Sequence, residues 1–373
     1  MASLPSCRRA FTALRFFFTL AVSSTLLFAA PASVEAKAAK KPIELRVVIV
    51  TTWEEIKDGK DVSGELHNWQ TKWPLNTPIA FPVGEHALQY DQKTHVLAIL
   101  TGMATARASA SITALGCDPR FDLSHAYWIV AGTAGVNPKI ASVGSAAWAR
   151  YVVDGDLSQE LDVRDMPADW PTGIVPYGKT KPYEQPAPLA HTDDANVSYA
   201  LNPSLVDWAY DQTRGLTLVD TDNLKKLRRP YTGPGQRPPF VLEGDGLMSA
   251  RTWYGAALED WAERWVPYWT QGKGVFAMSA EEDTGIMQAL TFLARDKRVR
   301  LDRVLILRAG SDYTVQPAGM TAGDFLVKEV HEGFPATPEA LDSLYATAAP
   351  VARYLADHWA TTRNATPAGT GAR

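Results

Sequence analysis

A run of branched apolar residues at 304–307 is the sequence feature that most constrains how this chain can fold. Such a run is typical of a parallel strand that is buried on both faces, because it offers neither face a polar side chain. A turn of small residues follows and leads directly to Asp312. Open α/β sheets bind their ligands at the carboxyl ends of their strands, so Asp312 is a candidate for chemistry. The alternative is structural, since Asp is also a common turn former and helix cap.

Three other apolar runs, at 43–52, 95–100 and 126–131, also predict buried strands, and helical segments lie between them. A chain of 373 residues is long enough for two ordinary domains, but nothing in the sequence forces a division and no internal repeat is visible. We therefore expect a single α/β domain with a mixed, largely parallel central sheet flanked by helices.

The N-terminus has the features of a secretory signal peptide in the expected order. Arg8, Arg9 and Arg15 precede an apolar run at 16–30, and small residues follow. The run is about 15 residues long, whereas about 20 are needed to span a bilayer; an uncleaved anchor is the alternative. We expect residues 1–36 to be removed, with cleavage near 32–36. The mature chain has no further apolar run of spanning length, which predicts an exported, periplasmic protein.

Charge and cysteine content exclude several classes of function. Charged residues make up 21% of the chain and its formal net charge is -4, so it lacks the basic field that nucleic acid requires. Cys117 is the one cysteine after the signal segment, which excludes an internal disulfide and a Cys/His metal framework. We expect Cys117 to be a small buried residue. The balance favours a small neutral or polar metabolite as the partner, with no metal site.

Two carboxylates follow the first predicted strand. The strand at 43–52 leads, one residue later, into Glu54 and Glu55, which would lie at or just past its carboxyl end. An exposed acidic turn is the structural alternative. We expect one of these two residues to share a pocket with Asp312, because the carboxyl ends of parallel strands meet at one edge of a sheet.

Small residues follow the next two strands. The strand at 95–100 ends in Thr101 and Gly102, before a helix at 103–115 whose free first amides can bind an anion. The strand at 126–131 leads into a segment whose backbone can approach a ligand closely. This segment consists of Gly132, Thr133, Ala134 and Gly135. A further strand is predicted at 143–153.

The second half of the chain begins with a proline-rich insertion at 154–239, which is interpreted as an elaborated loop region or lid because aromatic and apolar residues are frequent in it. A helix is expected within it at 203–213. Ser249 predicts the N-cap of a helix that reaches Trp265. The acidic residues 281–283 are expected in the first turn of a helix at 279–293, where they favour the helix dipole. A last helix at 338–359 precedes a polar tail, residues 361–373.

The order of four motifs resembles the nucleoside phosphorylase and nucleosidase superfamily. They are the glycine segment at 131–135, the run at 243–245 that ends in Asp245, the helix opening at 281–285 and the run from Arg308 to Asp312. The sequences around 101–102, 114–122 and 135–138 more closely resemble the purine nucleoside permease family. This resemblance covers about residues 43–335. It implies a nucleoside phosphorylase-like domain over 43–360.

The resemblance also implies roles for individual residues. Glu282 matches the carboxylate that binds the ribose hydroxyls, and Asp312 matches the acid that contacts or protonates N7 of the purine. Glu281, Asp245 and Ser311 belong to the same implied pocket, and Glu54 or Glu55 would activate a water molecule. These roles suit N-glycosidic cleavage, which builds positive charge on the sugar and negative charge on the base. Ala104 stands where the family's phosphate turn has Gly, which favours hydrolysis over phosphorolysis.

We therefore predict an exported protein that binds a purine nucleoside and cleaves it without a cofactor, with inorganic phosphate as the alternative co-substrate. The competing hypothesis is a non-catalytic nucleoside-binding component of nucleoside transport, which the family name implies. The resemblance also implies a homo-oligomer. A generic α/β hydrolase is disfavoured, because the sequence has no Gly-x-Ser-x-Gly nucleophile motif.

Overall fold

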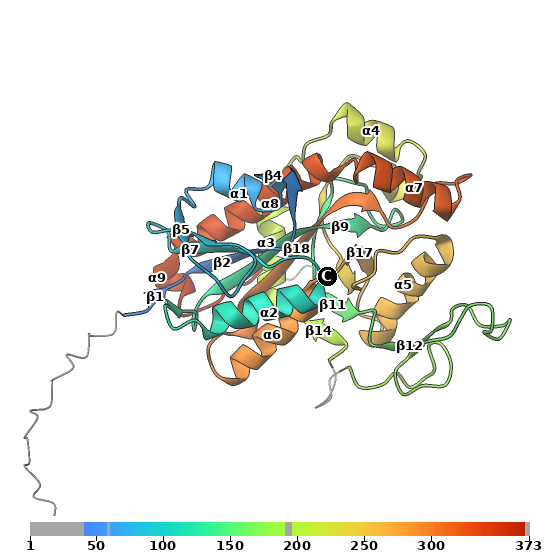
Figure 1. The fold of residues 1–373 in the computed structure, drawn as a ribbon, viewed down its shortest axis with the longest axis horizontal. Coiled ribbons are helices and arrows are strands. Elements are labelled where there is room, and N and C mark those ends of the chain that lie inside the picture. Colours follow the sequence, from blue (N-terminus) through green and yellow to red (C-terminus); the bar gives the residue numbers. More distant parts are fainter. Residues whose placement is uncertain (1–40, 58–59, 191–195, 370–373) are drawn as a thin grey trace, which may run out of the picture. The chain divides into compact units, whose positions relative to one another are not determined.

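Two parallel ten-residue strands, β9 (Tyr127–Val136) and β18 (Val304–Tyr313), lie side by side at the centre of the fold in a computed structural model (Figure 1). Their pairing runs from Val304 opposite Trp128 to Tyr313 opposite Val136, with one irregularity between Gly310 and Asp312. The predicted buried run of β18 is confirmed, since residues 304–307 are at most 1% exposed.

The structure describes residues 41–57, 60–190 and 196–369. The predicted signal peptide at 1–36, its cleavage site near 32–36 and the last four residues of the predicted tail lie outside the described residues. From Lys41 onward the chain forms one compact unit. Within the described residues, no helix combines the length and the apolar character needed to cross a membrane.

A mixed sheet of twelve strands forms the core of the described chain. On one side of β9, two parallel strands and then an antiparallel edge hairpin follow in the order β2 (Val47–Thr51), β7 (Val96–Leu100), β6 (Leu88–Asp91) and β5 (Thr77–Ile79). On the other side, the order is β17 (Phe276–Ala280), β16 (Asp245–Met248), β11 (Tyr151–Asp154) and β14 (Ser198–Ala200). β18 also pairs with β10 (Ala146–Trp148), which pairs with β15 (Val241–Glu243). The predicted α/β fold with a mixed sheet is confirmed.

Helices cover both faces of this sheet (Figure 1). α2 (Ala104–Cys117) and α6 (Asp283–Arg295) pack together on one face, and α8 (Thr337–Asp357) packs against β9 and β18 on the other. The small residues of α2 and α6 permit their close approach, because a Cβ at Gly285 would lie 2.4 Å from the carbonyl oxygen of Thr105. This contact brings the N-terminal ends of the two helices together.

The remaining elements are shorter or lie at the periphery. The helices are α1 (His67–Lys72), α3 (Pro203–Thr213), α4 (Asp222–Arg228), α5 (Ala256–Trp269), α7 (Ala322–Glu332) and α9 (Trp359–Thr362), with 3-10 turns at Gly233–Gln236 and Leu301–Arg303. The short strands are β1 (Ile43–Glu44), β3 (Glu54–Lys57), β4 (Lys60–Gly64), β8 (Phe121–Asp122), β12 (Ser158–Glu160) and β13 (Ile174–Pro176). The predicted helix at 203–213 is therefore confirmed.

Several predicted elements differ in the structure. The strands predicted at 43–52 and 143–153 are each divided into two, because their halves pair with different neighbours. The glycine segment at 132–135 continues β9 instead of forming a loop. Ser249 does not cap a helix: its hydroxyl donates to Asp156 at 2.6 Å, and α5 begins at Ala256. Cys117 is exposed at the end of α2, so its prediction as a buried residue was wrong.

Candidate nucleoside site

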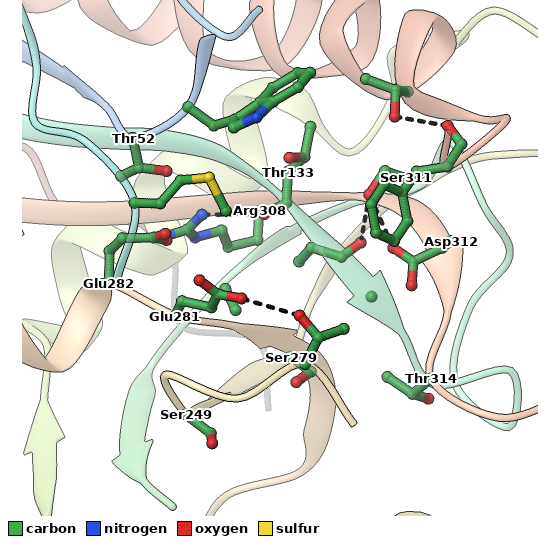
Figure 2. A pocket seen from close by; sticks show the side chains of 18 of the residues that line it. Thr52, Thr133, Ser249, Ser279, Glu281, Glu282, Arg308, Ser311, Asp312 and Thr314 are labelled. Carbon is green, nitrogen blue, oxygen red and sulfur yellow. Dashed lines mark hydrogen bonds and ion pairs between the residues drawn. The ribbon is translucent and has the colours of Figure 1, made fainter. Parts of the chain in front are cut away.

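A pocket of about 170 Å³ opens where β2, β9 and β18 end and meet β17 (Figure 2). Figure 2 shows Asp312 and Ser311 on one side of the pocket, with Glu281, Glu282 and Arg308 on the opposite side. This position agrees with the general location of ligand sites at the carboxyl ends of parallel strands. The pocket therefore has a single carboxyl at one end and a charged cluster at the other.

Arg308 is the centre of the charged cluster. It lies on β18, is 2% exposed, and its guanidinium bonds Glu282 at 2.8 Å, Asp283 at 2.5 Å and the carbonyl oxygen of Thr133 at 3.0 Å. Burial alone would lower the pKa of Arg308, but the carboxylates of Asp283 and Glu282 outweigh burial and raise it. Arg308 is thus a permanent cation that allows several buried carboxylates to coexist.

Gly132 on β9 provides the space for this guanidinium. A Cβ at this position would lie 2.3 Å from Nη1 of Arg308 and 3.1 Å from Oε1 of Glu65. A glycine is required here for close approach of side chains, although the backbone is an ordinary strand. Gly132, which was expected to approach the ligand with its backbone, does not line the pocket and instead leaves room for the guanidinium of Arg308.

Glu65 contributes a carboxylate that the sequence analysis did not single out. It lies just after the β3–β4 hairpin, is 3% exposed and lines the pocket. Its Oε2 accepts from the amide of Thr52 at 2.6 Å, the hydroxyl of Thr52 at 3.0 Å and the amide of Trp53 at 3.1 Å. Its Oε1 accepts from the amide and the hydroxyl of Thr133, at 2.7 and 3.1 Å. These donors fix the carboxylate between the ends of β2 and β9.

Burial raises the pKa of Glu65, and the nearby positive charge of Arg308 opposes that effect. The negative charge of Glu282 also raises the pKa of Glu65. A carboxylate with a raised pKa is a better proton acceptor than an exposed one. Glu65 therefore has the electrostatic setting of a general base.

Asp312 lies at the opposite side of the pocket and is only partly accessible from it. Ser311 donates its hydroxyl to Oδ1 of Asp312 at 2.9 Å. Burial raises the pKa of Asp312 to about 7, and the Ser311 hydrogen bond opposes this only in part. Asp312 is therefore available as a proton donor near neutral pH, as an acid in this position would need to be.

Glu282 and Glu281 precede α6 and do not lie in its first turn as predicted. Glu282 is the N-cap residue, is 4% exposed and accepts a hydrogen bond from the amide of Ala104 at 3.2 Å. Glu281 accepts from the hydroxyl of Thr252 at 3.1 Å, and burial raises its pKa. Both carboxylates line the pocket, as do Thr133, Ala134, Gly135 and Ser311.

Other candidate residues lie away from the pocket lining. Thr101 is fully buried and donates to the carbonyl oxygen of Thr51, and Gly102 takes a positive φ of 82° in the following turn. Asp245 accepts from the amides of Arg150, Tyr151 and Val275 at 2.7–2.9 Å, so it joins the ends of β11 and β17.

The two carboxylates predicted to activate water are in the β3 strand. Glu54 accepts from the amide of Leu66 at 2.8 Å and does not line the pocket, and the side chain of Glu55 lies outside the described part of the structure. Glu65, which follows the hairpin, occupies the pocket instead. The sequence signal that could have identified Glu65 is its position next to Leu66 and Trp69. These apolar residues are buried and indicate that the chain returns to the core after the polar hairpin.

Within the described ranges, no group of three or more His, Cys, Asp or Glu side chains is placed to hold a metal ion. The pocket lining offers carboxyl groups, hydroxyl groups and the guanidinium of Arg308.

Comparison with known proteins identifies the family. A model of the purine nucleoside permease family matches residues 44–367. The chain belongs to the purine nucleoside permease family. Among other members of the purine nucleoside permease family, it is 30% identical over 265 residues to a probable purine nucleoside permease of Schizosaccharomyces pombe, across 69% of this chain and 75% of that protein. It is 28% identical over 266 residues to the purine nucleoside permease of Candida albicans, across 70% of this chain and 64% of that protein.

Solved structures also align with this purine nucleoside permease family member. The 5′-methylthioadenosine/S-adenosylhomocysteine nucleosidase of Neisseria meningitidis aligns with a TM-score of 0.46 and 14% identity, over 82% of this chain and 99% of that one. The corresponding nucleosidase of Streptococcus pneumoniae aligns with a TM-score of 0.48 and 13% identity, over 81% of this chain and 100% of that one.

Proposed function

We propose that this protein binds a purine nucleoside and hydrolyses its N-glycosidic bond. The observation that carries the proposal is the arrangement of three carboxyl groups around one pocket: Asp312 at one end, and Glu282 and Glu65 beside Arg308 at the other. The purine as the base class is supported by the names of the relatives, which are purine nucleoside permeases.

Asp312 would act on the base. When the bond between C1′ of the sugar and N9 of the purine breaks, its electron pair moves onto the base. Asp312, whose pKa is raised to about 7 by burial, donates a proton to N7 and neutralises that charge. The partial accessibility of Asp312 from the pocket allows this contact.

Glu282 and Glu65 would act on the sugar and on water. Glu282 accepts hydrogen bonds from the sugar hydroxyls, and the negative cluster stabilises positive charge on the sugar as the bond breaks. Glu65 takes a proton from a water molecule that attacks C1′. The products are the free base and the free sugar, and the proton taken by Glu65 balances the proton given by Asp312.

The α2 N-terminus supports hydrolysis over phosphorolysis. The amide of Ala104, which a phosphate at this helix end would need, donates to Glu282 at 3.2 Å. Arg107, one turn further on, pairs with Glu85 at 2.9 Å on the surface, and its side chain is 62% exposed. The amide of Ala104 and the guanidinium of Arg107, which could bind a phosphate, thus already bind carboxylates.

The test is to incubate the chain from residue 37 onward with inosine, adenosine or guanosine, with and without inorganic phosphate. Free base should appear at the same rate in both conditions, together with free sugar. Base formation that requires phosphate, with sugar 1-phosphate as the second product, would replace hydrolysis by phosphorolysis. No base under either condition would refute the enzymatic proposal.

A second candidate function is non-catalytic nucleoside binding within a transport system, which is favoured by the permease names of the relatives. Calorimetry with inosine separates the two. Reversible binding at full stoichiometry with an unchanged nucleoside recovered afterwards supports transport, whereas recovery of free base supports hydrolysis.

We also propose export of the chain, on the basis of the signal-like N-terminus. Mass spectrometry of the protein recovered from a periplasmic fraction would show a new N-terminus near 32–36. Recovery of the intact N-terminus in the cytoplasmic fraction would refute export.

A further inference from the structure

Helix α7 buries an acidic residue where an apolar one would be expected. Its buried residues are Phe325 and Glu329, which are four positions apart and so lie on one face of the helix. Glu329 is only 3% exposed, and its Oε2 has no hydrogen-bond partner among the described residues. Burying an unpaired carboxyl destabilises a fold, so its presence on this face calls for a reason other than packing.

A second cavity lies next to the main pocket and is lined in part by Glu329. It has a volume of about 70 Å³ and is lined by Glu329, Asp312, Ser311 and Tyr231, among others. Asp312 and Ser311 also line the main pocket, so Asp312 lies on the wall between the two cavities. Asp312 therefore borders both cavities, and Glu329 borders the second one.

We propose that Glu329 and Asp312 share a proton across this second cavity, and that Glu329 is a positioning residue that keeps Asp312 protonated. The catalytic meaning of this inference rests on the proposed function, because that function makes Asp312 the acid. The carboxyl pair itself is a property of the folded protein and does not depend on substrate.

The electrostatic setting agrees with such a pair. Burial and, second to it, the negative charge of Asp312 together raise the pKa of Glu329 to about 7. Coupling between two carboxyls is mutual, so ionised Glu329 must also hold the proton of Asp312 more tightly. Burial raises the pKa of Tyr231 and that of Tyr254, and the negative charges of Asp312 and Glu329 act on both in the same direction. The four side chains therefore lie in one region.

Two other charged groups on α7 act on Glu329, in opposite directions. Lys328 lines the same cavity and lowers the pKa of Glu329, whereas Glu332 raises it; the Nζ of Lys328 lies 3.7 Å from Glu332. Tyr313 lines the same cavity and donates its hydroxyl to the carbonyl oxygen of Gly235 at 2.6 Å. Asp312 is the acidic partner that faces Glu329 across the cavity.

The proposed proton path is balanced. Asp312 gives its proton to the leaving base and becomes ionised. Glu329 then takes a proton from solvent, passes it to Asp312 through the small cavity and is itself ionised again, while Glu65 returns to solvent the proton that it took from water. The pair therefore resets the acid after each turnover without opening the main pocket.

The experiment measures the titration of Asp312 without substrate. The side-chain carboxyl carbons are labelled with ¹³C, the Asp312 resonance is assigned with Asp312→Asn, and its chemical shift is followed from pH 4 to pH 9. In Glu329→Gln the midpoint of Asp312 should fall by on the order of one pH unit. Asp91→Asn is the matched control, because Asp91 is also a buried carboxyl, at 4% exposure, but lies on β6 and lines neither cavity. It should leave the midpoint unchanged.

The unsubstituted protein provides a second measurement that does not depend on the folding of the variant. Asp312 and Glu329 should each show two inflections at the same two pH values, as coupled groups do. A single inflection for Asp312, or a midpoint that Glu329→Gln does not change, overturns the inference. Nucleoside cleavage is assayed separately: a lowered midpoint in a protein that cleaves no nucleoside would support the carboxyl pair and remove the proposed function instead.

Discussion

Glu65 and Thr133 are 68 positions apart in the chain, yet Oε1 of Glu65 accepts both the amide and the hydroxyl of Thr133, at 2.7 and 3.1 Å. Glu65 follows β2 and the β3–β4 hairpin, whereas Thr133 lies within β9, so this contact ties the segment after β2 to the carboxyl-terminal half of β9. It holds one carboxylate between Arg308 and the pocket. The proposed mechanism depends on this placement.

Glu65→Gln tests the proposed water activation. The amide nitrogen of Gln cannot accept from Thr52 and Trp53, so the variant should lose about 1–3 kcal/mol of stability. Loss of the base should lower kcat about 10²- to 10⁴-fold while inosine still binds. The measurements are steady-state kinetics, calorimetry and denaturant unfolding. Glu54→Gln is the comparison: if it lowers kcat as much as Glu65→Gln does, the water activator is in the β3 strand after all.

Asp312→Asn tests the proposed acid and its pH dependence. Because the pKa of Asp312 is raised to about 7, its protonated form predominates below pH 7 and is lost above it. The kcat of the unsubstituted protein should therefore decline as pH rises through about 7. The variant should lose about 10²- to 10⁴-fold in kcat, should lack this decline and should retain most of its affinity. Asp342→Asn, at an exposed surface ion pair with Lys72, serves as the control. A decline that persists in Asp312→Asn would assign it to another group.

Gly132→Ala tests the space that Arg308 needs. The added Cβ would lie 2.3 Å from Nη1 of Arg308, which is held by buried carboxylates and cannot simply move. We expect about 1–3 kcal/mol of destabilisation and at least a tenfold loss of nucleoside cleavage. Gly215→Ala is the matched control, because a Cβ there meets nothing within 4 Å. Equal effects of the two substitutions, measured by thermal unfolding and kinetics, would show that the loss comes from helix or strand propensity instead.

Glu259→Gln tests the cost of a buried carboxyl outside the pocket. Glu259 is 2% exposed, and burial raises its pKa to about 7, with the hydroxyl of Thr314 opposing this only in part. The folded state therefore binds the proton more tightly than the unfolded state. This contribution to stability is complete below the ordinary pKa of 4.5 and is lost as pH rises through about 7.

In the unsubstituted protein, the ionisation of Glu259 should lower the free energy of unfolding by about 2 kcal/mol between pH 5.5 and pH 8. Glu259→Gln should remove this part of the pH dependence. Denaturant unfolding at both pH values measures this difference. Asp260→Asn, which removes an exposed carboxylate paired with Arg264 on the same helix, should change it by less than about 0.5 kcal/mol. An unchanged pH dependence in Glu259→Gln would mean that Glu259 stays ionised in the folded protein.

The sequence predicted the class of fold because buried strands have a local signature. The run at 304–307 has no polar residue to place on a solvent face, and the structure buries it completely. The limits of the strands were less predictable. Gly132 and Gly135 indicate a loop by local propensity, but hydrogen bonds from β18 and β17 hold them in β9. Strand pairing of this kind depends on residues far away in the chain.

The sequence by itself was enough to propose Asp312 and Glu282 for a nucleoside site, because they belong to short motifs in a recognisable order, and the structure brings both to one pocket. Only the tertiary structure identified Glu65 as the third carboxylate, Arg308 as the cation that holds the cluster together, and Glu329 on a cavity that Asp312 also borders. The reason is physical. A buried carboxyl acquires its pKa and its partners from groups on other elements, and the distances to those groups are set by sheet pairing and helix packing, which adjacent residues do not encode.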